Sequence, residues 1–119
     1  NVSYIYNAPN FMVWQDIMFI LLYSMFVSVV LDPGGVDSAR ALATILTQYG
    51  FNKVQRSCYE CTTFVEKNLN LLKKDIDRVT DYYDVVRMYQ YPVEGMVAIT
   101  SLSQKKWQRT MLRPPKEEK

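Results

Sequence analysis

Apolar side chains recur at alternating spacings of four and three residues in one stretch, and this pattern constrains the fold more than any other feature of the chain. The residues are Val65, Leu69, Leu72, Ile76 and Val79. Residues spaced in this way lie on one face of an α-helix. The opposite face is mostly charged, so we expect a solvated helix surface there and an apolar partner surface elsewhere in the chain.

A strand and a second helix are predicted upstream of this helix. Residues 26–31 form a short valine-rich run typical of a buried central strand, which ends at the chain breaker Asp32-Pro33-Gly34-Gly35. Apolar residues then recur at helical spacing from residue 39 to residue 49. Gly50 suits the left-handed conformation that ends many helices.

Three further stretches are typical of strands. Residues 51–62 are rich in Val, Tyr, Thr and Cys and are long enough for two short strands. Residues 84–91 and 96–101 give two more strands, joined by a turn at residues 92–95. The predicted class is therefore α+β, a ferredoxin-like β-α-β-β-α-β sandwich with an extra C-terminal strand and two helices on one face of an antiparallel sheet.

Charge is distributed unevenly along the 119 residues, a length that suits one domain. Residues 102–119 hold six of the 14 Lys and Arg residues but only two of the 12 Asp and Glu residues. Such a segment favours an acidic partner such as nucleic acid, although a solvated terminus would have the same composition. We expect an N-terminal extension of unknown role (1–24), a ferredoxin-like domain (25–101) and a basic C-terminal tail (102–119).

The cysteine content and hydropathy argue for a cytoplasmic protein. Cys58 and Cys61 are the only cysteines and there is no histidine, so a four-ligand zinc site is excluded. Positions three apart on a strand point to opposite faces, so we expect two separate reduced thiols. The apolar run 17–31 is shorter than the roughly 20 residues of a membrane span, and we interpret Met25 as leading directly into the first strand.

Several short motifs, in order, resemble the CRISPR-associated protein 2 family. Members open with a hydrophobic strand that ends in Asp, here residues 29–32, and continue with a helix that carries Arg, here Arg40. A Tyr-Gly pair and a strand of the type Val-Gln-x-Ser-(Val/Cys)-(Phe/Tyr)-Glu-Cys follow, here Tyr49-Gly50 and residues 54–61. Residues 85–89 look like the family's fourth strand, and the resemblance covers roughly residues 25–101.

The resemblance implies a two-fold homodimer that acts in CRISPR spacer acquisition. Such a dimer binds double-stranded prespacer DNA and bridges dimers of the integrase, CRISPR-associated protein 1. Some members are described as metal-dependent endonucleases for RNA or DNA, which implies Asp32 as the catalytic and metal-binding residue. The alternative is a ferredoxin-like regulatory or binding domain with no nuclease role.

Asp32 suits a metal site only in a dimer. Two symmetry-related Asp32 carboxylates could share one Mg²⁺ or Mn²⁺, ions that prefer oxygen ligands. Because the chain has no histidine to act as a general base, hydrolysis would depend on a metal-bound hydroxide. The other interpretation is that the Asp32 side chain only stabilises the turn that follows it, as in an Asx-turn.

Six cations are candidates for phosphate contacts. They are Arg40, Arg56, Arg87, Lys105, Lys106 and Arg109. The arginines could instead pair with surface carboxylates. Aromatic residues interleaved with charge are Tyr82, Tyr83, Tyr89, Tyr91 and Trp107. They could stack on single-stranded bases, but packing in strands or in a dimer is the favoured interpretation.

Overall fold

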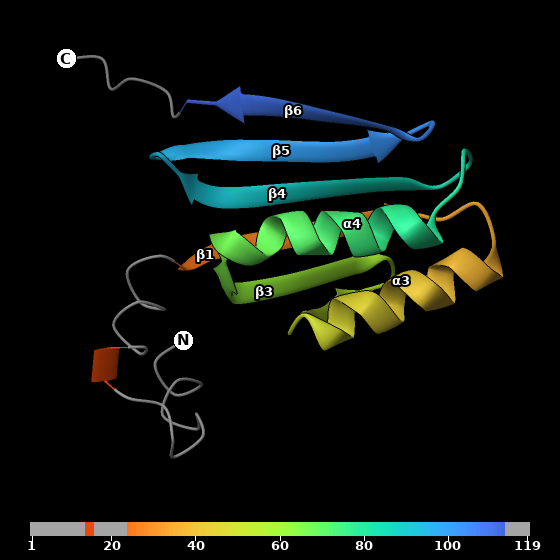
Figure 1. Ribbon diagram of the computed structural model, residues 1–119, viewed down its shortest axis with the longest axis horizontal. Coiled ribbons are helices and arrows are strands. Elements are labelled where there is room, and N and C mark those ends of the chain that lie inside the picture. The colour runs from red at the N-terminus through yellow and green to blue at the C-terminus, as the bar shows by residue number, and fades with distance from the viewer. Residues whose placement is uncertain (1–13, 16–23, 114–119) are drawn as a thin grey trace.

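A computed structural model describes residues 14–15 and 24–113 of the chain. Six antiparallel strands form one sheet in the order β2-β3-β1-β4-β5-β6. Two helices, α3 and α4, cover one face of this sheet and leave the other face uncovered (Figure 1). The predicted α+β class is confirmed, and the arrangement is consistent with a ferredoxin-like fold.

The elements have the following bounds. The strands are β1 (Ser24–Asp32), β2 (Asn52–Gln55), β3 (Cys58–Val65), β4 (Val85–Val93), β5 (Met96–Ser103) and β6 (Lys106–Leu112). The helices are α3 (Val36–Gln48), a short 3₁₀ turn η1 (Glu66–Asn68) and α4 (Leu69–Val79). The stretch 51–62 indeed gives two strands, which are separated by a turn at Ser57, where φ is +64°.

The central strand β1 alternates between the two faces of the sheet. Its buried residues pack beneath the helices and are Met25, Val27, Val29 and Leu31. Its other residues lie on the uncovered face, as expected for a strand with a period of two. The predicted helix pattern is confirmed, because Leu69, Leu72 and Ile76 of α4 are buried. Val65 differs, since it ends β3 and the helix starts after it.

The two cysteines lie as predicted. Cys61 is buried on the helix side of β3, whereas Cys58 is half-buried and on the uncovered face. Both thiols are free. The Cys58 sulfur lies 3.7 Å from the Ser28 hydroxyl oxygen.

The C-terminal segment differs from the predicted tail. Strand β5 continues to Ser103 with Leu102 fully buried, and β6 pairs with β5 along residues 106–112. The boundary expected after residue 101 therefore falls inside β5. The sequence did not predict β6, because only Trp107 and Met111 of this strand pack against the core, and exposed polar and basic residues alternate with them. Residues 114–119 and most of the extension 1–24 lie outside the described residues.

Asp84 joins two loops at one end of the sheet. Its carboxylate is only 4% exposed and accepts hydrogen bonds from the Gly34 N–H (2.6 Å), the Ser38 hydroxyl (2.6 Å) and the Asp81 N–H (2.7 Å). Burial raises the pKa of Asp84, but these bonds outweigh it and hold the pKa below its usual value. A Cβ on Gly34 would lie 2.8 Å from the Cβ of Tyr83, so the close approach of the loops requires glycine.

Replacing Asp84 with Ala should lower the free energy of unfolding by about 1–3 kcal/mol, because three partly buried hydrogen bonds would lose their charged acceptor. The folded-state pKa lies below the unfolded value, so the stabilisation is present above about pH 4 and is lost as the pH falls through the folded-state pKa. Urea denaturation of both proteins at decreasing pH measures this difference. If the difference in unfolding free energy between the two proteins stays constant at acid pH while both remain folded, the stabilising role of the ionised Asp84 carboxylate is contradicted.

Candidate nucleic-acid interface

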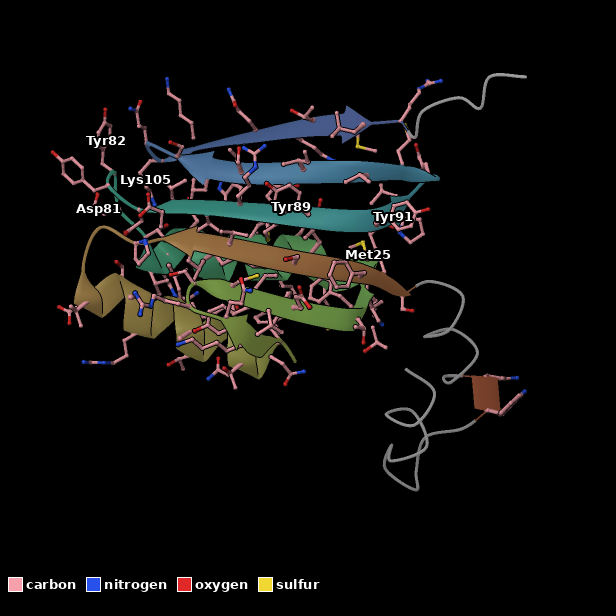
Figure 2. All side chains as sticks on the ribbon, turned by 180° about the vertical axis from the view of Figure 1, so that it is seen from behind. Met25, Asp81, Tyr82, Tyr89, Tyr91 and Lys105 are labelled. Carbon is pink, nitrogen blue, oxygen red and sulfur yellow. The ribbon has the colours of Figure 1, made fainter. Side chains whose placement is uncertain are left out.

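The sheet face opposite the helices, which we call the open face, carries exposed apolar side chains. They are Phe26 (36% exposed), Val30 (41%), Tyr91 (50%) and Leu112 (49%). The strand register places Phe26 opposite Tyr91 across β1 and β4. Figure 2 views this face, with Tyr89 and Tyr91 pointing out from β4. Contiguous exposed apolar patches of this kind mark interaction surfaces.

Asp32 is the last residue of β1 and lies exposed at one end of the open face. Its register partner on β4 is Val85. Within residues 14–15 and 24–113, no group of three or more acidic or cysteine side chains could hold a metal ion. Among the described residues of a single chain, Asp32 is therefore not part of a ligand cluster of that size.

The predicted arginines lie on three different parts of the fold. Arg40 is exposed on α3, and Arg56 is exposed in the turn between β2 and β3. Arg87 lies on the open face, where its Nε donates a hydrogen bond to the Tyr89 hydroxyl (2.7 Å) and its guanidinium lies 5.5 Å from the centre of the Tyr89 ring. These three cations therefore come from a helix, a turn and the open face of the sheet.

The cations of the β5–β6 hairpin also have different surroundings. The Lys105 ammonium donates to the carbonyls of Asp77 (2.7 Å) and Thr80 (3.1 Å) and lies 3.3 Å from the Asp77 carboxylate. Lys105 thus ties the hairpin to the end of α4. Lys106 is exposed, and Arg109 is exposed on the helix side of β6, between Trp107 and Met111.

A basic hollow lies between α4 and β6, and the sequence pattern did not reveal it. It has a volume of about 700 Å³ and is lined by Asn70, Lys73, Lys74, Asp77, Arg78 and Trp107. The Lys73 ammonium lies 4.9 Å from the centre of the Trp107 ring, and the indole N–H donates to Asp77 (3.3 Å). The charged face of α4 becomes part of a site only because β6 pairs into the sheet beside it. We call this feature the α4–β6 hollow.

The aromatic residues fall into two groups. Trp107 packs against the core and Tyr89 is half-buried, so packing is confirmed for these two. Tyr82 and Tyr83 are 49% and 79% exposed in the loop before β4, so they do not pack in a strand of this chain, and their packing in a dimer stays a prediction.

The family model of CRISPR associated protein Cas2 matches residues 25–110, nearly all of the sheet and both helices. The chain belongs to this family. The match begins at Met25, where β1 enters the sheet, and extends into β6, so it includes residues 102–110 of the segment that we expected to be a tail. Searches of curated proteins and of solved structures found no match.

Membership in the Cas2 family indicates a CRISPR-related role, and the family is generally associated with nucleases. None of the helices in the described part of the chain is long and apolar enough to cross a membrane. The upstream half of the apolar run, residues 17–23, lies outside that part, and the other half is β1.

A Mn²⁺ titration followed by electron paramagnetic resonance tests the predicted role of Asp32. If two symmetry-related Asp32 carboxylates share one ion, one Mn²⁺ should bind per two chains. Asp32→Asn should abolish this binding. Asp37→Asn, an exposed carboxylate at the start of α3, is the matched control and should leave it unchanged. Equal Mn²⁺ binding by wild type and Asp32→Asn would place the metal elsewhere.

Proposed function

We propose that this Cas2 family member is a homodimeric subunit of the spacer-acquisition machinery. In this role it holds double-stranded prespacer DNA and bridges dimers of the integrase, CRISPR-associated protein 1. The observation that carries the proposal is the open face, because a domain with helices on one side only leaves apolar side chains of its sheet in water. A second copy of the chain is the simplest cover for that face.

The dimer would pair the two open faces around a two-fold axis. In such an interface the same patch serves both chains, so Phe26, Val30 and Tyr91 would be buried twice. Burial of apolar area stabilises association by roughly 25 cal/mol per Å². The sheet also ends in β6, whose outer edge has no neighbouring strand among the described residues and offers backbone groups for further pairing. The free edge on this side of the sheet is therefore that of β6, since β5 is paired on both sides.

Duplex DNA would bind outside the dimer interface, mainly through phosphates. Arg40, Arg56, Arg109 and the α4–β6 hollow all lie off the open face, and a dimer carries two copies of each. Arg87 would be covered by the second chain and would not contact phosphates. The described elements include no helix-turn-helix and no metal-bound finger that would read bases. Recognition would therefore depend little on sequence.

Metal-dependent endonuclease activity on RNA or DNA is the second candidate function. The observation that favours it is the exposed position of Asp32 on the open face, where dimerisation could bring two copies near each other. Mg²⁺ held there would supply a hydroxide for phosphodiester hydrolysis. A non-catalytic regulatory or binding domain remains the alternative, and a folded protein without affinity for nucleic acid would support it.

A salt titration of duplex binding tests phosphate recognition. The logarithm of affinity should fall with the logarithm of salt concentration by about 0.9 for each phosphate contacted. Removing one contact with Lys74→Ala or Arg109→Ala should weaken binding to all duplexes alike and flatten the slope by roughly that amount. Lys53→Ala, an exposed cation on the far edge strand β2, is the control.

Two results would count against this account of binding. One is a salt slope that neither variant changes, and the other is a strong preference for one DNA sequence. Deleting residues 102–119 is not a suitable test, because Leu102 is part of the core.

A further inference from the structure

Tyr82 and Tyr83 form an exposed aromatic pair that the dimer proposal does not use. Their rings are arranged edge to face with centres 5.3 Å apart, and their exposed fractions are 49% and 79%. Tyrosines are amphipathic side chains that contribute strongly to binding when they become buried. Two adjacent tyrosines in water therefore point to a binding site.

The backbone that carries this pair is held at several points. The Tyr82 N–H donates to the Asp81 carboxylate (2.7 Å), the Asp81 N–H to the Asp84 carboxylate (2.7 Å) and the Asp84 N–H to the Asp81 carbonyl (3.0 Å). Lys105 holds the Thr80 carbonyl from the neighbouring hairpin (3.1 Å). A site on a preorganised backbone loses less conformational entropy when it binds a ligand.

The pair lies at the end of the sheet where Asp32 lies. The register of Asp32 with Val85 places Tyr83 two residues before the strand position beside Asp32. Figure 2 shows Asp81, Tyr82 and Lys105 together at this end. A hollow of about 390 Å³ opens beside Tyr83 and extends to the start of α3, with Val36 and Asp37 in its lining. This space suits a planar ring that stacks on a tyrosine.

We propose that Tyr82 and Tyr83 bind an unpaired nucleobase by stacking. A base fits better than a phosphate, because Asp32, Asp37 and Asp81 are carboxylates at this end of the domain and would repel an anion. A base is neutral and aromatic, and its exocyclic amino groups can donate hydrogen bonds to such carboxylates. The inference rests on the proposed nucleic-acid function and adds a site for a single-stranded end or a splayed nucleotide.

The experiment compares a blunt duplex with the same duplex carrying a short single-stranded overhang, using the full chain and fluorescence anisotropy. Stacking of one base corresponds to an affinity gain of about 5- to 150-fold, so the wild type should prefer the overhang within that range. Tyr83→Leu should lose most of the preference, and Tyr83→Phe, which keeps the ring, should retain it. Both variants should bind the blunt duplex as the wild type does, because the phosphate contacts lie elsewhere.

The outcomes separate this inference from the proposed function. The stacking site is overturned if the wild type binds blunt duplex normally but shows no preference for the overhang. It is also overturned if Tyr82→Leu and Tyr83→Leu both keep the overhang preference. In both cases phosphate binding stands. If the tyrosine variants keep the preference and lose a protein partner in co-sedimentation, the pair is a protein contact and the inference fails. If no duplex binds at all, the proposed function fails. Stacking is then measured as quenching of the fluorescence of a single-stranded oligonucleotide that contains 2-aminopurine. The wild type and Tyr83→Phe should quench this fluorescence, and Tyr83→Leu should not.

Discussion

The structure depends on the one-sided burial of strand β1. Alternate residues of this strand, from Met25 to Leu31, lie under both helices, and their neighbours Phe26 and Val30 face away from the core. A shift of one residue in register would exchange the two faces, so the pairing with β3 and β4 is strongly specified. Because the neighbours are apolar as well, the same register that builds the core also creates the open face that we propose a second chain covers.

The end of the sheet at Asp32 depends on a second interaction, the buried carboxylate of Asp84. It holds the loop after β1 and the loop before β4 in one position, so that Asp32 and the Tyr82–Tyr83 pair share a rigid setting. Lys105 links the β5–β6 hairpin to the same end of the domain through its hydrogen bonds to the Asp77 and Thr80 carbonyls. The cations that we propose for phosphate contacts are on α3, in the β2–β3 turn, on β6 and around the α4–β6 hollow, so backbone recognition and base recognition would use different parts of the fold.

Sequence reasoning found the elements whose burial has a clear period. The spacing of Leu69, Leu72 and Ile76 predicted both the helix and its core face, because a helix that covers a sheet buries one stripe of side chains. It did not find β6, because only Trp107 and Met111 of that strand pack inward at the sheet edge and its composition is that of a solvated segment. The sequence did not predict the α4–β6 hollow for the same reason, since β6 forms one side of it. The exposure of Tyr82 and Tyr83 depends on loop geometry, which a spacing pattern does not contain.

Sedimentation equilibrium of the full chain tests the central claim, that a second copy covers the open face. At micromolar concentration the wild type should have the mass of two chains. Val30→Glu, which places a charge in the centre of the open face, should have the mass of one chain with an unchanged circular dichroism spectrum. Leu71→Glu, a substitution of a 56% exposed leucine on α4, should remain dimeric. A wild-type mass of one chain, or a Val30→Glu variant that remains a dimer, would contradict the account.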